Sequence, residues 1–271
     1  MKTAVAHVGP DRRQPPAAPE LQGTGPAVSL SARWARDEAE LRSAQRLRWR
    51  VFAQELGADI PQRPGQPRGH DVDQFDPHCE HLLIHADAGD GGPPRLVGTY
   101  RVLTADGARR AGGWYSETEF DLAPLEPLRP GMVELGRSCV DPDFRHGGVI
   151  LMLWSSLASF MQRHRVASVI GCASLPMPDG GVNAAGVWHQ LSRTHLVAPP
   201  WRVRPQLALP VDSLPPAPRV ETPALIKGYL RCGAKVLGPP AWDPAFRCAD
   251  LPLLLRWDDL APSYRRHLVS K

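Results

Sequence analysis

The sequence predicts a single mixed α/β domain, in which helices pack against a sheet of mostly antiparallel strands. Two observations predict this class. Short apolar runs bounded by turn residues, typical of strands, are followed near the middle of the chain by a strand–helix–strand unit. No internal repeat is visible along the chain. Because 42% of the 271 residues are hydrophobic, the chain can bury a core of this size.

The N-terminal part of the chain predicts a tail, a helix and a loop. Residues 1–28 are rich in proline, glycine and alanine and lack periodicity, which predicts a disordered tail ahead of a domain over residues 29–271. Apolar residues at helical spacing predict the first helix over 35–56, ended by Gly57. A loop rich in Pro, Gly and Asp then spans 57–77.

Strands and helices follow through the rest of the chain. Runs of strand-forming residues between turn signals predict the strands, and helical periodicity predicts the helices. The predicted strands are 79–86, 95–103, 113–116, 132–140, 166–173, 235–237 and 246–257, and the predicted helices are 149–162, 182–194 and 223–232. A proline-rich segment over 198–220 is predicted to lack regular structure.

Charge, cysteine content and apolar runs limit the class of protein. The net charge of +4 is far from the concentrated basic surface of a nucleic-acid binder, so no nucleic-acid partner is expected. Five irregularly placed cysteines favour a reducing cytoplasm. The N-terminus lacks a signal-peptide pattern, and the longest apolar run, 149–154, is too short to cross a bilayer. We expect a cytoplasmic protein, and peripheral contact of the 198–220 segment with the inner membrane stays open.

A basic, glycine-containing loop connects the strand over 132–140 to the following helix. Glycines let a phosphate approach the backbone, and a helix start supplies unpaired N–H donors. The spacing differs from a Walker loop and from GxGxxG, but it suits the pyrophosphate of a pantetheine carrier or the single phosphate on an acyl carrier protein. An ordinary strand-to-helix turn is the alternative interpretation. The predicted phosphate-binding residues are Arg145, His146, Gly147, Gly148 and Val149.

Charged residues on several predicted elements suggest an internal charge network. Arg48 lies four residues before Phe52, so the two share a helix face. Arg101 interrupts a run of strand formers, and a buried strand seldom carries Arg without an acid partner. The candidate acids are Asp73 and Asp76 in the loop and Glu134 on the central strand, which also carries a further basic residue, Arg137. Separately, these residues are also compatible with a snorkelling Arg and with turn or cap acids.

Two rival sites are less consistent with the residue pattern. His78, Cys79, His81 and His85 cluster in HCEHLLIH, but their spacing fits no common structural zinc site, and we expect no metal. Cys139 with His146 lacks a third orienting residue, so a buried core cysteine is the favoured interpretation.

The charged set resembles the signature of acyl-homoserine lactone synthases, a branch of the GNAT acyltransferase superfamily that uses acyl carrier protein thioesters. Arg101 lies in GTYRVLT, and Glu134 and Arg137 lie in ELGRSCVDP. The chain is more similar to the ornithine acyl-ACP N-acyltransferases, which make lyso-ornithine lipid. Shared features are DxxDxxxxHLL, RHGGVILMLW and PALIKGYLRCGAKVLGPPAWDPAFRCADLPLLL, and the match extends over about residues 45–265. The lactone synthases have a tryptophan soon after Phe52, where this chain reads AQELGADI, which favours the lipid-forming family.

The resemblance implies a GNAT fold with splayed central strands and a defined reaction. A (3-hydroxy)fatty acyl group would move from acyl carrier protein to the α-amine of L-ornithine, the first step of ornithine-lipid synthesis, with no metal or redox cofactor. Alternatives are an acyl-homoserine lactone synthase, a long-chain N-acyl amino acid synthase, and a non-catalytic GNAT-like binding module. The carrier phosphate would bind the Arg145–Val149 loop, and the fatty chain an apolar pocket, with Leu151, Leu153, Trp154, Leu157 and Phe160 as candidates.

The implied chemistry assigns roles to the charged set. Glu134 is the candidate base, directly or through water, and it would need burial or a water relay because an ordinary Glu is a poor base for an amine. Backbone N–H groups around Ser138 would stabilise the oxyanion. Arg48, Arg101 and Arg137 would bind the substrate carboxylate and pair with Asp73, Asp76 and Glu134. The predicted substrate-binding residues are Arg48, Phe52, Asp73, Asp76 and Arg101; the anion for the ornithine side chain would be Asp73, Asp76 or Glu117.

Overall fold

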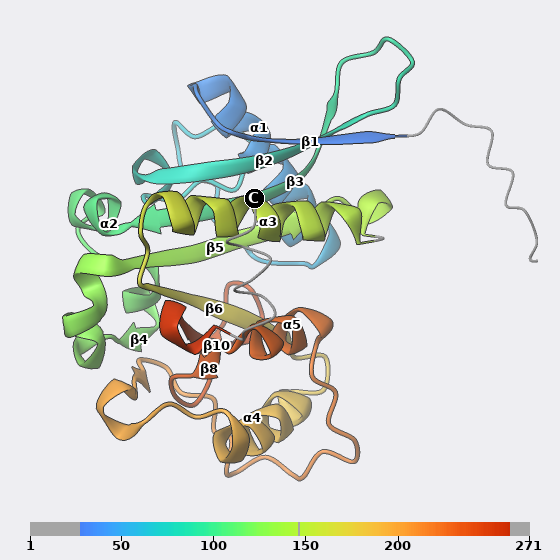
Figure 1. Cartoon of the computed structure of the whole chain (residues 1–271). Helices are drawn as coiled ribbons and strands as arrows, with labels where there is room; N and C mark the ends of the chain where they lie inside the picture. The colour runs from blue at the N-terminus through green and yellow to red at the C-terminus, as the bar shows by residue number, and fades with distance from the viewer. Residues whose placement is uncertain (1–27, 146, 261–271) are drawn as a thin grey trace, which may run out of the picture.

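The computed structural model of the protein describes residues 28–145 and 147–260. An eight-stranded sheet runs through the molecule in the order β1-β2-β3-β5-β6-β10-β8, with β9 paired to β10 (Figure 1). A two-stranded sheet of β4 and β7 lies beside it. The strands are β1 Ser29–Trp34, β2 Cys79–Asp87, β3 Arg95–Thr104, β4 Phe120–Asp121, β5 Met132–Val140, β6 Ser168–Pro176, β7 Arg204–Pro205, β8 Lys235–Val236, β9 Ala241–Asp243 and β10 Cys248–Arg256.

Five α-helices pack around this sheet. On one face, α3 covers the N-terminal half through Leu153 and Leu157, while α4 and α5 cover the C-terminal half (Figure 1). On the other face, α1 packs through Leu47 and Val51 against Cys139 of β5. The helices are α1 Glu38–Trp49, α2 Ala105–Ala111, α3 Gly148–Arg163, α4 Val182–Thr194 and α5 Ala224–Cys232.

The two central strands, β5 and β6, run parallel and then part. Met132 to Glu134 pair with Ser168 to Ile170, and neither strand pairs with the other beyond that point. A Cβ at Gly171 would lie 2.5 Å from the Leu135 carbonyl oxygen, so only glycine fits where the strands separate. The predicted splayed central strands are therefore confirmed.

A β-bulge in β5 lies at the same place. Gly136 pairs with Arg101 of β3, and Cys139 pairs with Thr99. The two positions are three residues apart on β5 but only two apart on β3, so β5 contains one extra residue. Arg137 takes up the extra residue with a φ of 50°, in the left-handed region that non-glycine residues seldom adopt. The bulge reverses which face of the sheet the later residues of β5 contact.

Most predicted elements are confirmed, with shifted ends. Helix 182–194 and strand 132–140 match their predicted bounds, and the first helix ends in a π-helical turn, Arg50–Glu55. The strand predicted near 113–116 is wrong, because Tyr115–Thr118 forms a 3₁₀ turn. Strands β1, β4, β7 and β9 and helix α2 were not predicted. The predicted tail lies outside the described residues except for its last residue. No helix in the described part of the chain is long and apolar enough to cross a membrane.

Candidate active site

Arg48 anchors a buried ion network between α1 and the loop that precedes β2. Its side chain is fully buried, which requires anionic partners. Arg48 Nε donates to Asp71 Oδ2 at 2.9 Å, and its Nη2 donates to Asp76 Oδ2 at 2.7 Å. Both aspartates are themselves buried. The helix position of Arg48 therefore fixes the path of the loop.

Arg101 on β3 extends the network to a third aspartate. Its Nη1 donates to Asp73 at 2.6 and 2.7 Å and to Asp76 at 3.0 Å. Although burial opposes ionisation, Arg48 and Arg101 hold the pKa of Asp76 well below its ordinary value. Arg101 likewise lowers the pKa of Asp73 against the effect of burial. The loop acids stay ionised at neutral pH.

Arg137 lies at the edge of the network, where β5 and β6 part. Its Nε is 3.3 Å from Asp71 Oδ2, and its Nη2 is 3.5 Å from Asp73 Oδ2. The guanidinium lies between two aromatic rings, 4.7 Å from the centroid of Tyr115 and 4.6 Å from that of Phe246. Its ion pairs are longer than those of Arg48 and Arg101, and its side chain keeps 13% exposure. Arg137 is therefore the network arginine with the loosest contacts and the most exposed side chain.

Phe52 is connected to Arg137 by Phe246, which contacts both side chains. Its ring meets Phe246 edge-on at 5.7 Å between centroids, and Phe246 in turn stacks on the Arg137 guanidinium. The structure thus brings Arg48, Phe52, Asp73, Asp76, Arg101 and Arg137 into one connected cluster.

Glu134 is buried beside this cluster but has different partners from those expected. Its carboxylate accepts the N–H of Tyr115 at 2.7 Å, the N–H of Ser116 at 2.8 Å, and a short hydrogen bond from the Ser116 hydroxyl. The predicted pairing of Glu134 with an arginine is wrong, because these loop donors occupy the carboxylate. Burial raises the pKa of Glu134, while the donors from Ser116 and Tyr115 oppose the shift.

Ser138 lies within the β5 bulge. In the pairing of β5 with β3, Gly136 and Cys139 have partners but Ser138 has none. On its other side, β5 pairs with β6 only as far as Ile170 of β6. The backbone around Ser138 therefore lines the gap between the parted strands. Its assignment as an oxyanion donor stays a prediction.

The predicted phosphate loop joins β5 to α3. Gly147 has a φ of 100°, which glycine adopts without strain, and no side chain caps the N-terminus of α3. Arg145 pairs through both Nη atoms with Glu55 at 2.6 and 2.7 Å, and its Nε donates to the Val140 carbonyl at 3.1 Å. His146 lies outside the described residues.

The first residues of α3 are packed closely on the sheet. Gly148 opens the helix, and the Val149 side chain is buried. A Cβ at Gly98 of β3 would lie 2.6 Å from Val149 Cγ1, so this glycine allows the close approach. The start of the helix is therefore held firmly against the sheet.

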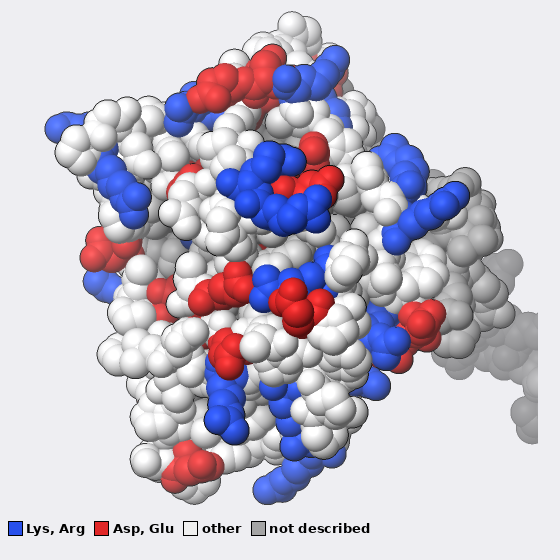
Figure 2. Space-filling view, turned by 90° about the vertical axis from the view of Figure 1, so that its left-hand side faces the viewer, with Lys and Arg blue, Asp and Glu red and all other residues white. Residues whose placement is uncertain are grey.

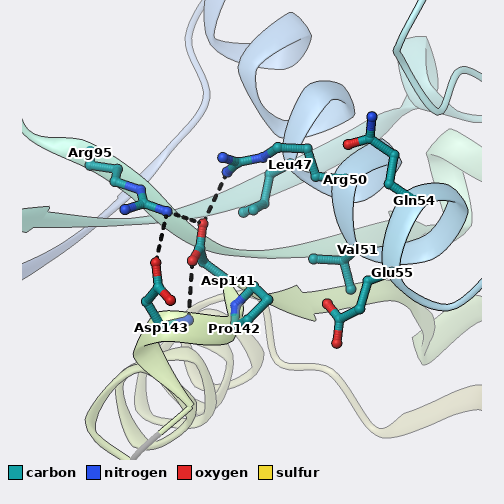
Figure 3. A pocket seen from close by; sticks show the side chains of 9 residues that line it. All are labelled: Leu47, Arg50, Val51, Gln54, Glu55, Arg95, Asp141, Pro142 and Asp143. Carbon is teal, nitrogen blue, oxygen red and sulfur yellow. Dashed lines mark hydrogen bonds and ion pairs between the residues drawn. The ribbon is translucent and has the colours of Figure 1, made fainter.

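A pocket of about 350 Å³ opens next to this loop (Figure 3). Arg50, at the end of α1, and Arg95 of β3 both reach Asp141 Oδ2, at 3.1 and 2.7 Å (Figure 3). Glu55 lines the pocket and also pairs with Arg145, so the pocket and the loop share a wall. Further lining residues are Leu47, Val51, Gln54, Pro142 and Asp143.

Comparison with known proteins identifies the family. Residues 47–155 match the model of the acetyltransferase (GNAT) domain. The chain is 36% identical over 256 residues to the L-ornithine N(alpha)-acyltransferase of Rhizobium meliloti (strain 1021), covering 90% of this chain and 85% of that protein. It is 35% identical over 252 residues to the protein of the same name from Rhodobacter capsulatus, covering 90% and 96%. The chain belongs to this family.

Because it belongs to the L-ornithine N(alpha)-acyltransferase family, the protein is an acyltransferase, as predicted. Solved structures share its fold. One is FeeM, an N-acyl amino acid synthase from uncultured soil microbes, with 12% identity, a TM-score of 0.51, and coverage of 86% of this chain and 93% of that chain. Another is BjaI, a CoA-dependent acyl-homoserine lactone synthase, with 18% identity, a TM-score of 0.50, and coverage of 86% and 82%.

Burial keeps His81, Cys79 and Cys139 of this acyltransferase uncharged. His81 Nε2 lies 3.0 Å from the Asp76 carbonyl oxygen, and burial lowers the pKa of His81 to about 4. Burial raises the pKa of Cys79 and of Cys139 to about 12, so both thiols stay protonated at neutral pH. A protonated thiol is a poor nucleophile, which disfavours Cys139 as a catalytic nucleophile.

The sequence reasoning missed several residues of this region. Asp71 alternates with Asp73 in DVDQFD, and that pattern was the available signal. Tyr115 stacks on Arg137 from a segment predicted to be a strand. Glu119 and Asp250 face each other nearby; no local motif marks Glu119, and Asp250 lies in the shared C-terminal segment but was assigned no role there. On the face of the molecule in Figure 2, acidic and basic side chains intermingle, so its coloured residues form no continuous basic stripe.

Proposed function

We propose that the protein transfers a (3-hydroxy)fatty acyl group from acyl carrier protein to the α-amine of L-ornithine, the first step of ornithine-lipid synthesis. The single observation that carries this proposal is the parting of β5 and β6 beside the ion network. Beyond Glu134 and Ile170 the described parts of the two strands form no further pairs, and Arg137 of the ion network lies on β5 just past that point. The similarity to L-ornithine N(alpha)-acyltransferases supports ornithine as the acceptor.

The donor would enter from the side of α3. The uncapped start of α3 and the positive-φ Gly147 offer backbone N–H groups to the phosphate of the carrier's pantetheine arm. Arg145 adds positive charge, although Glu55 neutralises part of it. From this loop the arm would follow the gap between β5 and β6 until the thioester lies beside Ser138. No cofactor beyond this carrier-borne thioester is needed.

The acceptor would bind on the opposite side, by its carboxylate. Arg137 is the arginine suited to this contact, because its ion pairs are long and its side chain is partly exposed. Arg48 and Arg101 are each held by two aspartates, so we infer that they fix the loop acids and thereby position Arg137.

The amine nitrogen would then attack the thioester carbonyl carbon. The backbone N–H groups around Ser138 would stabilise the oxyanion, the C–S bond would break as the amide C–N bond forms, and the carrier thiol would leave. The proton lost by the ammonium would go to Glu134, directly or through water. Burial supports this role, because it raises the pKa of Glu134 toward that of an amine.

The test is product analysis with purified protein and a 3-hydroxyacyl carrier protein. We expect mass spectrometry to detect N-acylornithine when ornithine is supplied, and no acyl-homoserine lactone when S-adenosylmethionine is supplied. Lactone formation would overturn the assignment in favour of the lactone synthases. Acylation of neutral amino acids in preference to ornithine would favour an N-acyl amino acid synthase of another specificity.

Peripheral contact with the inner membrane is a further part of the proposal. Leu207 and Val220, in or next to the proline-rich segment, are 47% and 37% exposed, and the product would be amphiphilic. Cosedimentation with phospholipid vesicles, expected to weaken in Leu207→Asp, tests it. Equal sedimentation of both proteins would remove this segment from membrane contact.

A further inference from the structure

A second polar cluster lies between the segment that precedes β4 and strands β6 and β10. A carboxylate oxygen of Glu119, the Cys172 thiol and a carboxylate oxygen of Asp250 all lie within 4.8 Å of one another. Asp243 and Cys248 lie equally close to Asp250. Cys172 belongs to the part of β6 that has already separated from β5.

The two central carboxyl groups of this cluster form no ion pair with any described cation. Asp250 is only 4% exposed, and it accepts a hydrogen bond from the Cys248 thiol at 3.4 Å. Both carboxylate oxygens of Glu119 are buried without a well-aligned hydrogen bond from the described residues, and the Tyr115 hydroxyl and the Asp250 carboxyl group are their polar neighbours. Burying carboxyl groups without a cationic partner is costly. Burial and the neighbouring Asp250 raise the pKa of Glu119 to about 9.

The cluster is continuous with the proposed reaction site on two sides. Ser116, whose hydroxyl donates to Glu134, lies 3.3 Å from the Cys172 thiol. Tyr115 packs under the Arg137 guanidinium, and its phenol is adjacent to Glu119. A bound amino acid with its carboxylate on Arg137 would therefore have the unbalanced carboxyl pair within its reach.

The other acids considered for a cationic substrate group are already occupied. Asp73 and Asp76 pair with Arg101, and Asp76 pairs with Arg48 as well. Glu117 pairs with Arg129 at 2.6 Å. Among the described acids next to the gap, Glu119 and Asp250 are the pair that lacks a basic partner.

We propose that Glu119 and Asp250 bind the side-chain ammonium of the amino acid acceptor and so select a diamino acid over a neutral one. This inference rests on the proposed function. The ammonium supplies the positive charge that the pair lacks and further hydrogen-bond donors for its oxygens, and the acceptor's α-amine stays free to face Glu134 and the thioester.

The test compares ornithine with norvaline, which has the same carbon chain without the terminal amine. In Glu119→Gln and Asp250→Asn, we expect kcat/KM for ornithine to fall about tenfold or more, mainly through KM, because one of the two carboxyl groups that accept from the ammonium is lost. The value for norvaline should change by less than about threefold. Glu126→Gln, which removes a 70% exposed acid of the neighbouring segment, is the matched control and should leave the preference intact.

Three outcomes would overturn the inference. A parallel loss with both acceptors would show that the pair acts in catalysis or folding. Stoichiometric zinc in the purified protein that is lost in Asp250→Asn would make the cluster a metal site.

The third is equal binding of ornithine and norvaline to the unmodified protein, measured by calorimetry without acyl donor. This binding measurement also separates the two proposals. Tight, ornithine-selective binding without acyl transfer would leave the inference standing and refute the proposed reaction.

Discussion

Arg48 on α1 and Asp76 before β2 form an ion pair of 2.7 Å in which each side chain is only 1% exposed. The pair joins two segments of the chain at the centre of the proposed acceptor site. Because Asp76 also accepts from Arg101 of β3, one carboxylate connects a helix, a loop and a strand. The network is therefore both a structural element and the support for Arg137.

Removing one side of this pair should be strongly destabilising. Arg48→Met removes the closest cation of the buried Asp71 and Asp76 and leaves them only the longer contacts with Arg137 and Arg101, and breaking a buried pair in this way typically costs about 3–5 kcal/mol in the free energy of unfolding. Urea denaturation measures the loss. The control is Arg109→Met, which breaks an exposed pair with Asp106 and should cost less than about 1 kcal/mol. Similar midpoints for the two variants would contradict the structural role of Arg48.

The loop acids should make the protein sensitive to low pH. The pKa values of Asp73 and Asp76 are lower in the folded protein than their ordinary value of 3.8, so the folded state holds fewer protons there than the unfolded chain. Their stabilisation is complete above the ordinary pKa and is lost as pH falls toward the folded values. Thermal unfolding between pH 6 and pH 3 should therefore show a steeper fall for the unmodified protein than for Asp76→Asn. If the unfolding temperatures of the two proteins fell equally with pH, Asp76 would not be a source of this acid sensitivity.

Glu119 should produce the opposite trend at higher pH. Its pKa is raised to about 9 by burial and by Asp250, and Asp243 and Tyr115 also face it. The folded state thus retains a proton that the unfolded chain releases near 4.5, and stability declines as pH rises from there to about 9. Glu119→Gln should remove this decline and gain at least about 1 kcal/mol at pH 8, the value of one pKa unit. A variant less stable than the unmodified protein at pH 8 would refute this.

Glu134→Gln tests the proposed base. The amide keeps the size of the side chain but cannot accept a proton, so kcat should fall about 100-fold or more while KM for ornithine changes little. Steady-state kinetics provide both values. Glu80→Gln, an exposed acid on β2, is the control. Unchanged kcat in Glu134→Gln would remove this residue from the mechanism.

Gly171 should be intolerant of any side chain. In Gly171→Ala the new Cβ would lie 2.5 Å from the Leu135 carbonyl, and pushing β5 and β6 apart should cost about 1–3 kcal/mol. At Gly136, a Cβ meets nothing within 4 Å, so Gly136→Ala is the matched control for stability. Denaturation curves compare the two. If Gly171→Ala were as stable as Gly136→Ala, the close approach of the strands would be wrong.

The elements with strong local patterns could be predicted from the sequence, and those defined by tertiary contacts could not. The helix Val182–Thr194 has clear periodicity and was predicted with the same bounds. The aromatic residues at 114–115 suggested a strand, but Trp114 is a core side chain on a turn. Strand β1 is short and polar, and its pairing with β2 defines it.

The site follows the same division. Arg101 was recognisable because an arginine inside a buried strand requires an acid, whereas Arg48 was singled out by its spacing to Phe52 and by the family resemblance, and the structure supplies acids for both. The partners of Glu134 could not be recognised from the sequence, because they are mainly backbone N–H groups, which nearly every residue carries. Glu119 and Asp250 come from distant parts of the domain sequence, so only the folded sheet brings them together.

The short pairing between β5 and β6 has a mechanical consequence. The N-terminal and C-terminal halves share three residue pairs between β5 and β6 within the described chain, and beyond them the sheet is interrupted. A fatty acyl thioester lodged in that interruption would touch both halves and replace the missing strand contacts. The donor substrate would thus act as a temporary structural component, and the loaded enzyme should be a stiffer molecule than the empty one.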